Sequence, residues 1–275
     1  YEPCPVTLDS ITPPDTIRTL LTRAATLGAG GRADELRATD WSYRDPQGRN
    51  AVHWSARVGH QAATRGLVLG RAAADLPDHD GVTPLMVAAG RADAWHVEFL
   101  LGNRANPNAA NAEEQTPLMY LAASCAPVLA AAADTTLPHT PETALLRLAA
   151  AGADLDAQDI RGNTALMHAT RGSGLRVRDL LAAGANPHLE DRRGRSTREV
   201  ADGPYSADGN YIQSLIGYAS YEANWSALPP EQRERYFEVV DTRYPRRRER
   251  DEPSRLGYIV KGSDYIPDSI LPYRP

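Results

Sequence analysis

The fold is decided by a stretch of nine residues, Gly81-Val82-Thr83-Pro84-Leu85-Met86-Val87-Ala88-Ala89. Related stretches begin at Gly48, Thr116 and Gly162. Gly48 lies 33 residues before Gly81, and Thr116 lies 33 residues after Thr83. From Thr116 to Thr164 the spacing is 48 residues, which is one period and 15 further residues. Self-similarity at such a period indicates a repeat architecture, in which each unit needs its neighbours to bury its apolar face.

A second block follows each of these stretches. It reads Leu67-Val68 before Arg71-Ala72, Leu100-Leu101 before Arg104-Ala105-Asn106-Pro107-Asn108, Leu148-Ala149 before Gly152-Ala153-Asp154, and Leu180-Leu181 before Gly184-Ala185-Asn186-Pro187. Each pair of blocks predicts two short helices per unit. Thr83 can cap the first helix, with Pro84 at its first position. Gly152 and Gly184 are expected to end the second helix in a left-handed conformation.

The two blocks resemble the ankyrin repeat, whose pattern is G-x-T-P-L-H-x-A-A, then L-L, then G-A-x-x-N. The resemblance covers about Asp45 to Asp202, with a degraded fifth copy from Gly194. It implies an all-α ankyrin-repeat solenoid. The family's histidine survives only as His53, and three methionines replace it: Met86, Met119 and Met167. We expect these methionines to fill the core, so that the seams between repeats depend on packing.

Three regions are expected along the chain. Residues 1–44 form an N-terminal segment with capping helices at 12–27 and 33–36. Residues 45–203 hold the repeats, with an insertion at 126–141 that either decorates a binding face or forms a plain surface loop. Residues 204–275 form C-terminal capping helices and a Pro/Tyr/Arg-rich tail. The many prolines of this tail predict an extended segment that docks on the body or on a partner.

The composition excludes several classes of protein. The net charge is -5, so nucleic acid is a poor default partner. No apolar run approaches the roughly 20 residues of a membrane span. The two cysteines, Cys4 and Cys125, are too few for a disulfide-dense scaffold. We expect either that Cys125 is a buried thiol or that it forms one disulfide with Cys4. Lys261 is the only lysine, an arginine-rich bias that hints at a bacterial genome of high GC content.

We find no catalytic motif, and we therefore expect no enzyme activity and no cofactor. The sequence has no phosphate-binding glycine loop, dinucleotide fingerprint, zinc-protease helix or serine-hydrolase elbow. The tripeptide at 78–80 has metal-binding residue types, but a solvated hairpin tip is the favoured interpretation. The basic run at 246–250 predicts either a solvated turn or a contact for an acidic protein partner.

The resemblance also predicts a binding surface, because ankyrin partners usually lie on the concave side, formed by hairpin fingers and inner helices. By position, that side should carry Trp54, Val87, Tyr120 and His168 with Arg57, Arg91 and Arg171. An exposed row of this kind has the chemistry of binding hot spots. The alternative is that Trp54 and Tyr120 pack between helices. The fingers would add polar rim contacts from Asp78, His79, Asp80, Asn111, Glu113, Asp159, Arg161, Asp191 and Arg192.

We therefore expect a non-catalytic module that binds another protein. Ankyrin arrays include immunity partners of secreted antibacterial toxins, notably type VI secretion lipase effectors, and the resemblance makes such a protein the most concrete hypothesis. A start at Tyr1 fits a removed secretion signal, so a periplasmic or secreted location is expected, with a cytoplasmic one as the alternative. Two other hypotheses are a periplasmic stress-protection scaffold and a host-targeting effector or enzyme with its chemistry after Pro204.

Overall fold

The computed structural model describes residues 13–124, 141–171, 174–201 and 216. The chain divides into two compact units, residues 1–212 and 213–275, and every helix below lies in the first. The helices are α1 (Asp15–Ala29), α2 (Ala33–Ala38), α3 (Ala51–Val58), α4 (Gln61–Leu69), α5 (Pro84–Gly90), α6 (Ala94–Gly102), α7 (Pro117–Ala123), α8 (Pro141–Ala150), α9 (Ala165–Ala169), α10 (Gly174–Ala182) and α11 (Thr197–Ala201). The described residues contain no β-strand, only two isolated bridges. The predicted all-α solenoid is confirmed.

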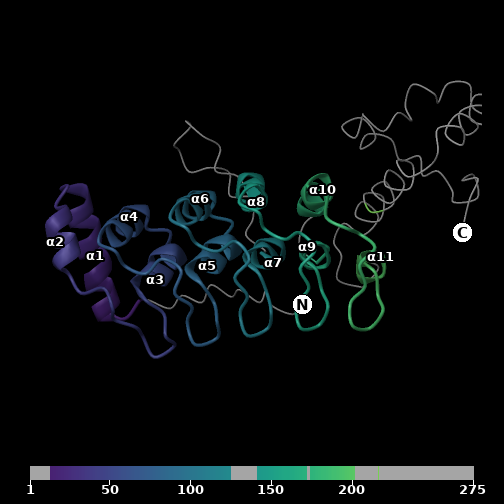
Figure 1. Ribbon diagram of the computed structural model, residues 1–275, viewed down its shortest axis with the longest axis horizontal. Helices are drawn as coiled ribbons and strands as arrows, with labels where there is room; N and C mark the ends of the chain where they lie inside the picture. The colour runs from purple at the N-terminus through teal and green to yellow at the C-terminus, as the bar shows by residue number, and fades with distance from the viewer. Residues whose placement is uncertain (1–12, 125–140, 172–173, 202–215, 217–275) are drawn as a thin grey trace, which may run out of the picture. The chain divides into compact units, whose positions relative to one another are not determined.

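The helices form two layers that follow the repeat (Figure 1). The first helices of the units, α3, α5, α7, α9 and α11, pack each against the next. The second helices α6, α8 and α10 pack in the same order behind them. Loops project on the side of the first layer and join successive units (Figure 1). The stack therefore brings residues about one period apart in the sequence side by side.

The helix starts follow from the cap residues that the sequence predicts. The hydroxyl oxygen of Thr83 accepts a hydrogen bond from the backbone N–H of Met86 at 3.3 Å, and Pro84 is the first helical residue. Thr116 and Thr164 cap α7 and α9 in the same way. At the far end of the second helices, Gly152 and Gly184 have φ of 84° and 100°, so their predicted left-handed conformation is confirmed.

The methionines of the T-P-L-H position are buried, which confirms their role in the core. Met86, Met119 and Met167 have at most 1 % of their surface exposed. At the one unit that keeps the histidine, His53 Nδ1 accepts from Asn50 N–H at 3.2 Å, and Nε2 lies 3.0 Å from the carbonyl of Val82 in the next repeat. In the next unit the sulfur of Met86 accepts the equivalent bond from Thr83 N–H. A thioether has no hydrogen to donate, so Met86 cannot make the second bond, to a carbonyl of the next repeat. Burial lowers the pKa of His53, which favours the neutral ring.

The N-terminal helices pack directly on the first repeat. Helix α1 lies against α4, and a side chain at Gly66 of α4 would place its Cβ 2.0 Å from the carbonyl oxygen of Ala24. Trp41 Nε1 donates to the carbonyl of Leu36 at 2.8 Å and so ties α2 to the chain that enters the repeats. The predicted helices at 12–27 and 33–36 are confirmed within a few residues.

Several sequence predictions lie outside the described residues. They concern residues 126–140 of the insertion predicted at 126–141, both cysteines, the basic run at 246–250 and the tail. Of the predicted C-terminal capping helix only Ile216 is described, and it is helical and buried.

Candidate protein-binding surface

Five loops with one common structure line the side of the first helix layer. We call them fingers 1 to 5, and they comprise residues 45–50, 78–83, 111–116, 159–164 and 191–196. In each, the first residue is Asp or Asn, and its Oδ1 accepts the backbone N–H groups two and four positions later at 2.8–3.0 Å. The fourth residue has positive φ, and it is glycine except at Glu114.

The side chains of these first residues hold their own loops together, so the prediction that they contact a partner is wrong. Asp159 and Asp191 are only 4 % and 6 % exposed, because their carboxylates accept hydrogen bonds from their own loops. Asp78 and Asn111 make the same turns and are half-buried. They were predicted as polar contacts for a partner, but their side chains are used inside the protein.

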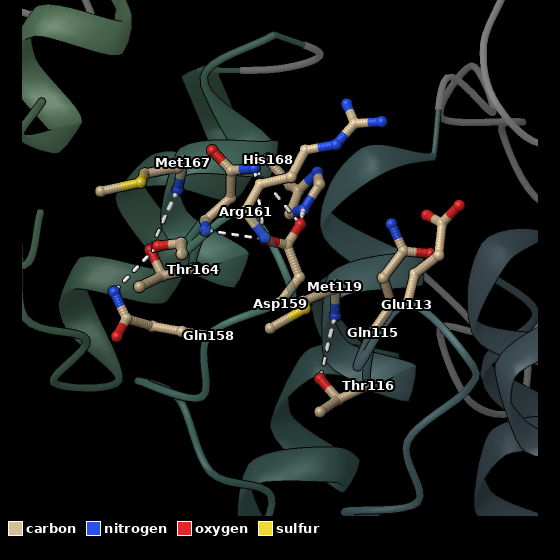
Figure 2. Close-up of polar contacts among 12 residues, drawn as sticks. Glu113, Gln115, Thr116, Met119, Gln158, Asp159, Arg161, Thr164, Met167 and His168 are labelled. Atoms are coloured by element: carbon tan, nitrogen blue, oxygen red, sulfur yellow. Dashed lines mark hydrogen bonds and ion pairs between the residues drawn. The ribbon is translucent and has the colours of Figure 1, made fainter. Parts of the chain in front are cut away.

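The same finger residues also bind the side chains predicted to face a partner. Trp54 Nε1 donates to Asp45 Oδ2 at 2.9 Å in finger 1, and Tyr120 OH accepts from Asn111 Nδ2 at 3.0 Å in finger 3. His168 Nε2 lies 3.0 Å from Asp159 Oδ2 in finger 4 (Figure 2). In fingers 1, 3 and 4, the residue nine positions after the finger start thus anchors the finger on the first helix of its unit.

Trp54 is buried, so the prediction of an exposed aromatic row is wrong at this position. Its exposed fraction is 1 %, with the guanidinium carbon of Arg49 at 4.5 Å and that of Arg57 at 5.8 Å from the ring centroid. The alternative interpretation, packing between helices, holds for Trp54. Tyr120 and His168 keep part of their surface exposed, and so does Val87.

The contacts of Asp159 determine its charge. Burial opposes ionisation, but hydrogen bonds from His168 and from the backbone N–H groups of Asn163 and Arg161 outweigh it and lower the pKa of this carboxyl to about 2. Asp159 therefore carries its negative charge at neutral pH. This fixes a charged acceptor beneath the imidazole of His168 at the base of finger 4.

The predicted arginines lie at the ends of the first helices. Arg91 Nη1 donates to the carbonyl of Arg57 at 2.6 Å, which links two neighbouring units. Both residues are half-buried, whereas Arg171 is exposed. Together with Tyr120 and His168 they form the surface between the fingers and the helix ends, which we call the finger-side surface.

The tips of the fingers are exposed and joined to one another. His79 N–H donates to Gln47 O, Ala112 N–H to Asp80 O, Ile160 N–H to Glu113 O, and Arg192 N–H to Arg161 O, at 2.8–3.0 Å. The predicted rim residues His79, Glu113, Arg161 and Arg192 are exposed here. Figure 2 shows the side chains of Glu113 and Arg161 extending away from their loops. The backbone of this edge is therefore fixed while its charged side chains are free to contact a partner.

Two kinds of residue at this surface were not predicted from the sequence. Asp45 was not recognised as the partner of Trp54, although it aligns with Asp78 at the 33-residue period. Arg193 and Ile160, which is 38 % exposed, were also missed at the finger tips. The alignment of the five loops would have identified all three.

Among the described residues there is no group of three His, Cys, Asp or Glu side chains that could hold a metal ion. In finger 2, Asp78 accepts bonds from its own loop, and the imidazole of His79 lies against Gly48. Within the same residues, no helix is long and apolar enough to cross a membrane.

Comparison with known families agrees with this architecture. A family model described as ankyrin repeats, in three copies, matches residues 15–111. A model of the single ankyrin repeat matches residues 161–192. The chain carries ankyrin repeats. The first match includes α1 and α2, which the sequence analysis assigned to an N-terminal cap. No curated protein matches the sequence.

Ankyrin repeats bind protein partners and are generally non-catalytic interaction modules. Between the two matches lie α7, the predicted insertion and α8. Helix α7 nevertheless has the threonine cap and proline of an ankyrin unit. Finger 3 is bonded to finger 4 through Glu113 O, so the ankyrin stack continues across the insertion.

Proposed function

We propose that this ankyrin-repeat protein binds another protein through its finger-side surface and has no chemistry of its own. The observation that carries the proposal is the anchoring of the fingers. Asn111 is bonded to Tyr120 and Asp159 to His168, so partly exposed aromatic side chains are already held in place before a partner arrives. Preorganised aromatic and arginine side chains reduce the entropy cost of association.

The partner class that we propose is a secreted antibacterial toxin of the lipase type, neutralised in the periplasm or outside the cell. Support comes by analogy from the ankyrin repeats, since ankyrin arrays include immunity partners of type VI secretion effectors, and from the arginine-rich composition, which hints at a bacterial origin. Inhibition would be steric: the finger-side surface would cover the active site or the membrane-docking surface of the toxin. Arg57, Arg91 and Arg171 would favour acidic groups on that toxin.

The experiment is capture followed by an activity assay. The full chain is immobilised, exposed to an extract of its own cells, and the bound protein is identified and purified. We expect a lipase whose hydrolysis of a phospholipid vesicle stops at one equivalent of this protein. Full lipase activity at a saturating concentration would refute the immunity role, and capture of a redox enzyme would favour a stress-protection scaffold.

A further inference from the structure

One position at the tip of each finger carries an ordered series of charges. It is the residue just before the positive-φ position, and along the stack it reads Gln47, Asp80, Glu113, Arg161 and Arg193. Fingers 2 and 3 thus present carboxylates, whereas fingers 4 and 5 present guanidinium groups. Glu114 in finger 3 and Arg192 in finger 5 are exposed and reinforce the same division.

The tip side chains have no partner within their own chain, as far as the structure describes it. Asp80, Glu113, Arg161 and Arg193 are all exposed, and none makes a side-chain hydrogen bond or ion pair among the described residues. The charges at the base of the fingers behave differently, because Arg49 pairs with Asp45 and Arg195 with Asp191. Within the described fingers, the charged side chains without a partner therefore lie at the outer edge.

The edge is continuous, so the spacing of its charges is fixed by the stack. Backbone hydrogen bonds join finger 2 to finger 3, finger 3 to finger 4 and finger 4 to finger 5. They include the bond from Ile160 N–H to Glu113 O at 3.0 Å, which spans the longer interval between the third and fourth units. Equivalent residues of a repeat stack recur at nearly regular steps. The four charged tips form one row of the order acid, acid, base, base.

A row of this order is complementary to its own reverse. A two-fold axis that passes between fingers 3 and 4 places Glu113 of one copy opposite Arg161 of the other, and Asp80 opposite Arg193. Both contacts occur twice, because a two-fold interface is isologous. The exposed side chain of Ile160 lies beside the axis. In the parallel arrangement, by contrast, like charges would meet and repel.

We propose that two copies of this chain associate through their finger tips about this axis, acid facing base. A second copy of the chain thus binds the row of finger tips. This contact does not involve the finger-side surface, where we propose that the toxin binds. Such contacts are exposed to solvent, so the association is weak and depends on salt.

The test is the monomer–dimer equilibrium of the full chain, measured by sedimentation equilibrium. We expect a dimer whose dissociation constant rises at least tenfold between 50 mM and 500 mM NaCl. Two double variants, Asp80→Arg with Glu113→Arg and Arg161→Glu with Arg193→Glu, should each be monomeric. A control, Arg23→Glu with Arg104→Glu, makes the same change in charge as Arg161→Glu with Arg193→Glu, but at exposed positions outside the fingers, and should still dimerise.

The decisive measurement is sedimentation equilibrium of an equimolar mixture of the two double variants. The tips of fingers 2 to 5 are then all positive in the first variant and all negative in the second, so the two should form a heterodimer at least tenfold tighter than the parent dimer. Circular dichroism of each variant shows whether it is folded. A parent chain that stays monomeric at 50 mM NaCl, a mixture that stays monomeric, or a control that dissociates equally would each overturn the proposal.

Discussion

Asp159 has two roles, which different substitutions can separate. It closes finger 4, and it places a negative charge next to His168. In finger 4, Asp159 Oδ1 accepts from the backbone N–H groups of Arg161 and Asn163 at 2.9 and 2.8 Å, while Oδ2 faces His168. Asp159→Asn keeps an oxygen for the loop, but it removes the charge and replaces the Oδ2 acceptor that faces His168 with an N–H donor. Asn111 occupies the same position in finger 3, which shows that an asparagine can close this loop.

The magnitudes follow from the contacts. The lowered pKa of Asp159, about 2 instead of 3.8, corresponds to at most about 2 kcal/mol, and to about 1 kcal/mol after solvent screening. We expect Asp159→Asn to lower the free energy of unfolding by this amount. Asp159→Ala also leaves two backbone donors without an acceptor at about 1 kcal/mol each, so we expect a loss of about 3 kcal/mol.

The assay is urea unfolding followed by far-UV circular dichroism between pH 7 and pH 2. Because the carboxyl pKa is lowered on folding, its stabilisation is complete above pH 4 and disappears as the pH falls toward 2. The difference between the parent and Asp159→Asn should therefore vanish with acidification. Glu190→Gln, at an exposed carboxylate that makes no side-chain hydrogen bond or ion pair among the described residues, serves as the control and should change nothing. A pH-independent difference, or equal losses for Asn and Ala, would refute the reasoning.

Three further predictions concern the fold. Trp54→Ala should lower the free energy of unfolding by about 3–5 kcal/mol in chemical denaturation, because this side chain is fully buried; a loss below 1 kcal/mol would contradict its placement. Glu114→Gly should raise stability by about 0.5–1 kcal/mol, since its φ of 58° is strained for a residue with a Cβ, and a loss of stability would argue against that conformation. Gly66→Ala should cost about 3 kcal/mol, because its Cβ would lie 2.0 Å from Ala24 O; an unchanged melting temperature would show that α1 packs elsewhere.

The sequence predicts the repeat units well because their determinants are local. Thr83 and Pro84 fix a helix start through contacts within one turn, and Gly152 fixes a helix end through its own backbone conformation. Met86 could be assigned to the core from its position in the period alone. Such features need no knowledge of the neighbouring unit.

The candidate surface is harder to predict because it depends on contacts between loops and helices. The position of Trp54 in the repeat indicated a surface residue. Its burial depends on the Asp45 carboxylate and the Arg49 guanidinium, both of which come from finger 1. Asp159 and Asp191 look like free rim charges in the sequence, yet each closes its own loop. The side chains at the very tips, such as Glu113 and Arg161, and Arg171 at a helix end are as exposed as the pattern predicts.

The central claim, that the finger-side surface binds a protein partner, is tested most directly by the affinity of the captured partner for surface variants. Isothermal titration calorimetry would compare Arg171→Glu and Tyr120→Ala with Leu146→Ala, an exposed side chain on α8 in the second layer. We predict at least a fivefold loss of affinity for each of the first two, since hot-spot residues contribute more than about 1 kcal/mol, and no change for the third. Unchanged affinity for Arg171→Glu and Tyr120→Ala, with both variants folded, would contradict the account.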